Sequence, residues 1–316
     1  METAIIICAV LAVIIGVAVG FLLWGFNYAC RGRGKGDVSE TGRVNIKNYG
    51  DAINENAEWI RREGGRFVTI ESFDGLKLTA RYLEREDCDV CVVMMHGYRS
   101  APEIDFSMAA KSYYINGYSV LLPYQRAHGK SEGKYITYGV RESKDCRDWV
   151  EYAVNVLGKK RIILSGMSMG TATVLLATAE GLPRNVVGIT ADCGFNCPAE
   201  IIGKVMAEMK VPPKVVLPIL NVLFKSVAGF DAYKHDAVEA MKNNTDIPVM
   251  FIHGESDNYV PCEMTLRMYE ACNAKKMLVT VPNADHGLSY LVDRPYVGSE
   301  IRKFFAEVLC EEKEWI

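Results

Sequence analysis

The sequence predicts an α/β fold, in which helices flank a mostly parallel central sheet, and two observations carry this prediction. From residue 90 onward, short apolar runs alternate with segments of helical periodicity, and uninterrupted apolar strands are typical of a parallel sheet buried on both faces. The chain has 316 residues, of which 49% are hydrophobic and 24% charged, which is enough to bury a large core. We therefore expect one large domain of this class, with a separate apolar segment ahead of it.

The N-terminal segment is predicted to cross a membrane. Residues 4–26 carry no charge, and as a helix they are long enough to span a hydrocarbon core of about 30 Å. Trp24 and Tyr28 lie where an aromatic belt is expected. A cleaved signal peptide would begin with positive charge, whereas here only Glu2 precedes the apolar run and the basic residues follow it. The sequence predicts a single-pass transmembrane anchor over residues 1–30, with the rest of the chain in the cytoplasm.

A linker is predicted after this anchor. Residues 31–48 mix glycine with charged residues, which is typical of a flexible linker, and the globular domain is expected over residues 49–316. At the boundary, Cys30 follows Tyr28-Ala29, which is a weak pattern for a cysteine lipidated after cleavage. The lack of a basic N-terminal region disfavours this interpretation.

Charge and cysteine content disfavour several kinds of site. The net charge of −3 and the pI near 6.0 give no basic surface for nucleic acid. Ten cysteines occur without a Cys-x-x-Cys pair or a His/Cys ligand spacing, so we expect reduced thiols, no metal site and no cofactor. A disulfide between Cys193 and Cys197 stays open as an alternative.

The strands of the domain are predicted in order along the chain. A helix over residues 49–62 comes first, because its apolar residues have helical spacing. Residues 67–72 and 76–83 alternate in polarity around Asp74-Gly75, which is typical of an antiparallel hairpin. The strands of the parallel part are predicted over residues 90–95, 119–122, 161–165, 186–191, 249–253 and 276–281.

Helices are predicted between the strands. Ser100 and Glu103 have the spacing of a capping box at the start of a helix that reaches Asn116. Residues 140–157 are amphipathic, and another helix is expected to end at about Ala179. These segments supply the helical layers of the fold.

One connection is much longer than the others. Residues from about 193 to 246 combine four prolines with many apolar residues. Length and hydrophobicity together favour a small helical cap insertion over the edge of the sheet. A core helix with irregular ends is the alternative.

A candidate nucleophile lies in the sequence Gly166-Met167-Ser168-Met169-Gly170, between a predicted strand and a predicted helix. A serine on such a turn is held in a strained conformation with its hydroxyl above the sheet, and a Cβ on either flanking glycine would collide with neighbouring elements. Ser168 is therefore the predicted nucleophile.

A serine hydroxyl needs a base within hydrogen-bond reach and an acid that orients the base. His286 follows the last predicted strand, where a loop can return to Ser168, and Asp257 follows the strand that ends at His253. We expect His286 to be the base and Asp257 the acid, with Asp192 as the alternative acid. The order serine, aspartate, histidine is expected of one particular fold.

Two backbone amides are predicted to form an oxyanion hole. His96-Gly97-Tyr98 follows the first buried strand, so we assign the amide of Tyr98 together with that of Met169. The histidines other than His286 are expected to be structural or to lie at the surface, and they are His96, His128, His235 and His253.

Taken together, these motifs resemble those of the α/β-hydrolases, over about residues 67–309. The motifs in order are His-Gly-Tyr at 96–98, Gly-Met-Ser-Met-Gly at 166–170, His-Gly-Glu-Ser-Asp at 253–257 and Ala-Asp-His-Gly at 284–287. Within that superfamily the chain is similar to membrane-anchored bacterial hydrolases of the serine aminopeptidase-like and Bem46-like groups. The resemblance implies the α/β-hydrolase fold, the Ser-His-Asp triad and the oxyanion hole.

One loop departs from the family pattern. Family members often have Asp-x-Arg-Gly-His-Gly-x-Ser after the second parallel strand, whereas this chain has Gln125-Arg126-Ala127-His128-Gly129. The departure leaves the catalytic roles intact and the contacts of this loop open.

The sequence predicts a serine hydrolase that cleaves carboxylic esters or thioesters through an acyl-enzyme. Its expected partners are a small ester, acyl or peptide substrate and the membrane. A serine peptidase acting on short peptides would use the same three residues. A membrane-tethered binding protein without activity is the third alternative, which the intact serine, histidine and aspartate disfavour.

Overall fold

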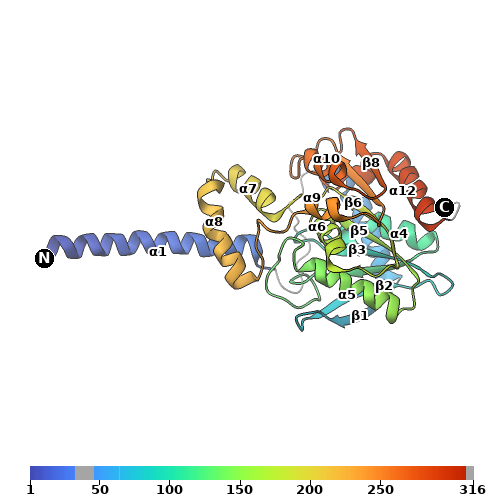
Figure 1. Ribbon diagram of the computed structural model, residues 1–316, viewed down its shortest axis with the longest axis horizontal. Coiled ribbons are helices and arrows are strands. Elements are labelled where there is room, and N and C mark those ends of the chain that lie inside the picture. The colour runs from blue at the N-terminus through green and yellow to red at the C-terminus, as the bar shows by residue number, and fades with distance from the viewer. Residues whose placement is uncertain (33–45, 64, 311–316) are drawn as a thin grey trace.

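A mixed sheet of eight strands forms the centre of the protein in the computed structural model, which describes residues 1–32, 46–63 and 65–310 (Figure 1). Its spatial order is β1-β2-β4-β3-β5-β6-β7-β8. The strands are β1 (Arg66–Glu71), β2 (Lys77–Leu83), β3 (Val90–Met95), β4 (Ser119–Pro123), β5 (Arg161–Met167), β6 (Val186–Asp192), β7 (Val249–Gly254) and β8 (Lys276–Val281). Strand β2 is antiparallel to β1 and β4, and the remaining pairs are parallel, which confirms the predicted mostly parallel sheet.

The direction in which successive parallel strands are added to the sheet reverses between β3 and β5. From β3 the chain adds β4 on one side and then crosses to add β5 on the other. In the register, Met95 of β3 pairs with Gly166, and Met167 pairs with Asp192 of β6. The carboxyl ends of β3, β5 and β6 therefore meet at one edge, and ligands of open α/β sheets bind at such a switch point.

Helices cover both faces of the sheet, because successive side chains of each strand point to opposite sides. In β3, Cys91, Val93 and Met95 belong to one hydrophobic cluster and Val90, Val92 and Met94 to the other. The first cluster includes α5 (Glu142–Asn155), α6 (Met169–Ala177), α9 (Ala237–Asn243) and α10 (Cys262–Ala271), and the second includes α2 (Ile46–Arg62), α4 (Ser107–Ile115) and α12 (Arg294–Leu309). Two short helices complete the layers, α3 (Pro102–Asp105) and α11 (Ser289–Val292).

The predicted helix over residues 100–116 is interrupted, and its capping box is wrong. The chain leaves helical geometry at Phe106, which separates α3 from α4. The hydroxyl of Ser100 donates to Asp105 at 2.5 Å, and Glu103 pairs with the buried guanidinium of Arg81 at 3.2 Å. A buried guanidinium without a carboxylate partner is strongly destabilising, so Glu103 pairs with Arg81 and does not cap the helix.

Helix α1 (Glu2–Cys30) projects away from the domain, and its last turns pack against α8 (Pro213–Leu223) (Figure 1). The segment predicted as a helical insertion contains α7 (Pro198–Glu208), α8, a π-helical turn at Phe224–Ala228, and α9. We call α7 and α8 the cap. Of the predicted linker, residues 33–45 lie outside the described residues. All ten cysteines are free, so the alternative disulfide does not form.

Candidate active site

Ser168 lies on a strained turn between β5 and α6. Its backbone has φ 56° and ψ −115°, and its amide donates to the carbonyl of Asp192 at 2.9 Å. A Cβ on Gly166 would lie 2.4 Å from the carbonyl oxygen of Gly170, and one on Gly170 would lie 1.7 Å from that of Met95. No side chain fits at either flanking position, which is the reason for the two glycines.

The structure brings Ser168, His286 and Asp257 together at the carboxyl edge of the sheet. Ser168 Oγ lies 2.9 Å from His286 Nε2, and His286 Nδ1 lies 2.7 Å from Asp257 Oδ2. With the imidazole proton on Nδ1, the serine hydroxyl donates to the ring and the ring donates to the carboxylate. Ser168 and Asp257 are buried. The alternative acid Asp192 meets this turn through its backbone carbonyl, as described above.

Asp257 is fixed by more donors than the sequence indicated. Its Oδ1 accepts from the amides of Tyr259 and Val260 at 2.9 and 2.8 Å, and His253 Nε2 lies 3.2 Å from Oδ2. Burial, the largest influence, raises the pKa of Asp257, but the hydrogen bonds from His253 and His286 outweigh it and hold that pKa below its ordinary range. The carboxylate is therefore ionised beside His286.

The two amides assigned to the oxyanion hole lie on the loop after β3 and at the first turn of α6. Among the described residues, neither the Tyr98 nor the Met169 amide nitrogen donates a hydrogen bond. The preceding Gly97 amide is occupied, because it donates to Asp105 Oδ2 at 2.6 Å. Unsatisfied amides at a helix N-terminus suit an anion.

Gln125 ties the loop after β3 to α6, a role the sequence did not reveal. Its amide donates to His96 Nε2 at 3.0 Å, and its Oε1 accepts from the hydroxyl of Thr173 at 2.9 Å. The side-chain amide also donates to the carbonyl of His96. His96 is buried between these groups, as expected of a structural histidine.

His128 supports the same loop in neutral form. Its Nε2 accepts from the amide of Arg99 at 2.9 Å, and its Nδ1 lies 2.9 Å from the carbonyl of Arg126. Burial, with a smaller contribution from His96, lowers the pKa of His128 to about 3. An imidazole that accepts on one nitrogen and donates on the other is uncharged.

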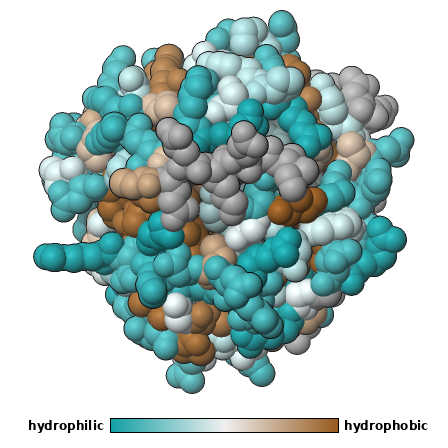
Figure 2. Space-filling view, turned by 90° about the vertical axis from the view of Figure 1, so that its right-hand side faces the viewer, coloured by the Kyte–Doolittle hydropathy of each residue, from teal (hydrophilic) through white to brown (hydrophobic). Residues whose placement is uncertain are grey.

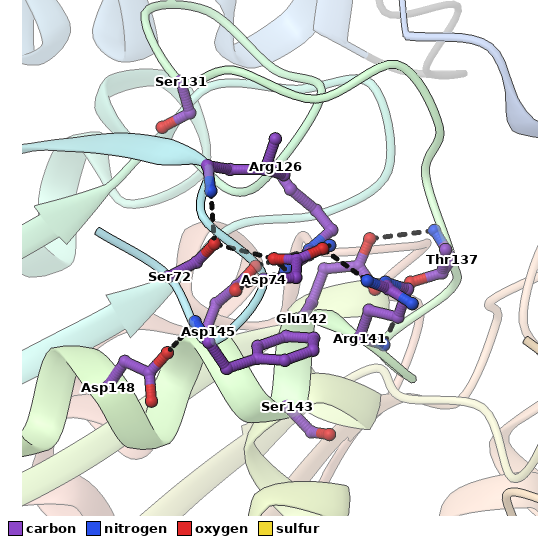
Figure 3. A network of polar contacts seen from close by, with 12 residues as sticks. Ser72, Asp74, Arg126, Ser131, Thr137, Arg141, Glu142, Ser143, Asp145 and Asp148 are labelled. Carbon is purple, nitrogen blue, oxygen red and sulfur yellow. Dashed lines mark hydrogen bonds and ion pairs between the residues drawn. The ribbon is translucent and has the colours of Figure 1, made fainter. Parts of the chain in front are cut away.

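The contacts of the unusual loop after β4 centre on Arg126 (Figure 3). Its guanidinium makes two bonds of 2.6 Å to Asp145 and two of 3.1 Å to Asp74. Burial, the largest influence, lowers the pKa of Arg126, but the two carboxylates outweigh it and raise that pKa above its ordinary value. The ion pairs anchor this loop to α5 and to the β1–β2 hairpin.

An apolar cavity of about 170 Å³ lies next to the site, between α1 and the cap. Tyr98 and Tyr259 line its inner end, and the Tyr259 ring packs edge-on against His286 with 5.1 Å between the ring centres. No local pattern in the sequence could reveal this cavity, because its walls come from five segments that are distant in sequence.

One group of ligand-type side chains occurs near the site. Single atoms of Cys193, Asp257 and His286 lie within 4.8 Å of one another. Thiolate, carboxylate and imidazole are zinc ligands, but Asp257 is hydrogen-bonded to His286, and His286 is hydrogen-bonded to Ser168. The absence of a metal and a cofactor stays a prediction.

Comparison with protein families identifies related chains. Residues 205–287 match the serine hydrolase (FSH1) family, a region that includes Asp257 and His286 but not Ser168. YqkD of Bacillus subtilis is 31% identical over 238 residues, which cover 74% of this chain and 77% of YqkD. The thiohydrolase aneE of Aspergillus aculeatus is 28% identical over 188 residues, which cover 52% of this chain and 58% of aneE.

Solved structures agree on the fold. The Pyrococcus furiosus esterase Pf2001 superposes with a TM-score of 0.61 at 23% identity, over 78% of this chain and 93% of the esterase. The mouse α/β hydrolase domain-containing protein 10 gives 0.56 at 17% identity, over 77% of this chain and all of that one. With the strained serine turn at the carboxyl edge of the sheet, these findings show that the chain belongs with YqkD to one family and is a serine hydrolase of the α/β-hydrolase fold.

Proposed function

We propose that the protein hydrolyses carboxylic esters or thioesters through an acyl-enzyme, with Ser168 as nucleophile, His286 as base and Asp257 as the orienting acid. The observation that carries the proposal is the chain of two hydrogen bonds, 2.9 Å from Ser168 Oγ to His286 Nε2 and 2.7 Å from Nδ1 to Asp257. This is the arrangement in which a base accepts the hydroxyl proton while its other nitrogen stays fixed.

In the first step, Ser168 Oγ bonds to the carbonyl carbon and its proton passes to His286 Nε2. The tetrahedral intermediate then breaks its bond to the alcohol or thiol, which leaves with the proton from Nε2. Water repeats the sequence on the acyl-enzyme and releases the carboxylic acid. In this proposal the amides of Tyr98 and Met169, which make no other hydrogen bond among the described residues, stabilise the oxyanion, and the loss of one such donor typically costs about 3 to 4 kcal/mol.

The ester or thioester bond is favoured over the peptide bond by two lines of support. The similar protein aneE is named a thiohydrolase, and the structural neighbour Pf2001 is named an esterase. The cavity beside the site is apolar, whereas an extended peptide would need polar partners for its backbone.

The proposal is tested with a fluorophosphonate probe, which reacts with an activated serine. We expect the wild-type protein to be labelled and Ser168→Ala to lose labelling completely. Ser165→Ala, which changes a serine of β5 outside the turn, is the control and should label like the wild type. Labelling that survives in Ser168→Ala would refute Ser168 as the nucleophile.

We further propose that residues 1–30 are a retained membrane anchor, with the domain that follows in the cytoplasm. Helix α1 is long and apolar enough to span a membrane, and its most apolar 18-residue window is not buried in the protein. Its end is part of the domain: Cys30 is buried, its carbonyl accepts from Ile136, and Gly32 bonds to Lys134. A cleaved segment would not share its last turn with the core.

A further inference from the structure

We infer that the cavity between α1 and the cap binds the acyl chain of a membrane lipid ester, so that the substrates are long-chain acyl esters taken from the bilayer. This inference rests on the proposed function and assigns the substrate class of the same site.

The cavity has the chemistry of an acyl-chain site. One wall is the last three turns of α1, which include Phe21 and Gly25, and the opposite wall is the cap, which includes Val205 and Leu220. Among the described residues, Arg99 is the charged side chain of the lining, and its guanidinium is bonded to backbone carbonyls at the end of α1. What remains is an apolar surface, which favours hydrocarbon.

The cavity approaches the reacting groups through two of its lining residues. Its inner end is formed by Tyr98, whose amide is a proposed oxyanion donor, and by Tyr259, whose ring packs on His286. An acyl chain lying along α1 would therefore bring its carbonyl end toward Ser168. Tyr138 has a strained backbone, with φ 55°. Its ring stacks on the ring of Tyr98, with 5.4 Å between the ring centres, and holds that ring in place.

The outer end of the cavity lies at the level of a membrane surface. At a rise of 1.5 Å per residue, about 20 residues of α1 span the hydrocarbon core. A span that starts near Ala4 ends near Leu23, where the cavity begins. The rings of Trp24 and Tyr28 stack there at 5.4 Å, as in an aromatic belt.

The cap itself has an apolar outer face next to α1. On α8, Val215, Ile219 and Val222 lie at helical spacing and are 62%, 48% and 63% exposed. Lys214 and Lys225 flank this stripe and are exposed as well. An amphipathic helix of this kind rests in the lipid interface, which places the cavity mouth against acyl chains.

The inference is tested by filling the cavity from α1. A Cβ on Gly25 would lie 3.8 Å from Leu220, so Gly25→Phe directs its ring into the cavity. Gly20 lies on the same helix with nothing within 4 Å of such a Cβ, so Gly20→Phe is the matched control. The full-length proteins are reconstituted into phosphatidylcholine vesicles, and kcat/KM is measured for p-nitrophenyl palmitate and p-nitrophenyl acetate.

We expect Gly25→Phe to lower the palmitate-to-acetate ratio of kcat/KM at least 10-fold and Gly20→Phe to leave both activities unchanged. Val205→Trp, on the opposite wall, should lower the same ratio, so one misfolded variant does not decide the result. An unchanged ratio in a folded cavity variant would overturn the inference. A wild-type protein that hydrolyses neither ester would instead overturn the proposed function.

Discussion

Several residues around the site adopt backbone conformations that side chains disfavour. Arg99, Tyr138, Ser168 and Cys193 have φ values of 52°, 55°, 56° and 46°. Such conformations persist only where the surrounding structure fixes them, and they gather at functional sites. For Arg99 the fixing contact is the hydrogen bond that its backbone amide donates to His128 Nε2. This bond couples a loop of the site to the protonation state of one imidazole.

The pKa of His128 predicts how stability depends on pH. In the unfolded chain an imidazole takes up its proton near pH 6.5, whereas in the folded protein burial delays this to about pH 3. Between these values the unfolded state binds more protons, so stability falls as pH falls, by about 1.4 kcal/mol per pH unit for one proton.

We expect His128→Gln to weaken this slope by about one proton in a urea titration from pH 7 to pH 4. His235→Gln is the comparison. Burial also lowers the pKa of His235, so this variant should change the slope in the same direction. An equal slope in wild type and His128→Gln would contradict the assignment.

The residues of the site differ in how far sequence reveals them. Ser168, Asp257 and His286 follow predicted strands, and parallel strands bring their carboxyl ends to one edge, so their meeting could be expected from spacing. Gln125 and Tyr259 act through contacts with side chains remote in sequence, those of Thr173 and His286. Spacing within one segment carries no information on such contacts. His253 stands four residues before Asp257, so its contact is local.

At the scale of elements, strands were easier to predict than helices. Strands β3 and β8 match their predicted ranges, and in β3 burial on both faces leaves an unbroken apolar run. The helix predicted over residues 100–116 breaks at Phe106, since Glu103 and Asp105 are used by Arg81 and by the loop after β3. Tertiary contacts of this kind override local propensity.

Alanine substitution of two helical glycines is predicted to change stability in opposite directions, because α6 lies close against β3 whereas α7 has room for a methyl group. Gly170→Ala would place a Cβ 1.7 Å from the carbonyl of Met95, so the two elements must separate, and we expect a loss of at least about 3 kcal/mol. Gly203→Ala in α7 meets its nearest neighbours at 3.8 Å and should gain up to about 1 kcal/mol. Thermal unfolding in detergent, followed by circular dichroism, measures both. Wild-type stability in Gly170→Ala would show that the packing is looser than described.

The whole molecule is polarised along α1. The face opposite to this helix, which carries α12, is mainly hydrophilic (Figure 2), whereas the side of α1 carries the exposed apolar residues of α8. A protein built this way has one side suited to lipid and one suited to water. This asymmetry could not be predicted in detail, because it depends on how the cap packs against α1.

The charges beyond α1 predict on which side of the membrane the domain lies. In spheroplasts of a bacterium that expresses the full-length protein, we expect added protease to leave the domain intact until the cells are lysed. A periplasmic marker protein tethered to the membrane serves as the control for protease access. Digestion of the domain before lysis would reverse the proposed orientation.

The end of α1 has carbonyl groups that need donors, as every helix end does. Here Tyr98 and Tyr138 donate to Ala29 at 2.8 Å each, and Arg99 donates to Tyr28 at 2.6 Å. These donors belong to the loops that line the site, so hydrogen bonds join the end of α1 to those loops. Cleavage at the end of α1, after Ala29, would separate these side chains from their partners, so release of the domain and loss of activity would become a single event.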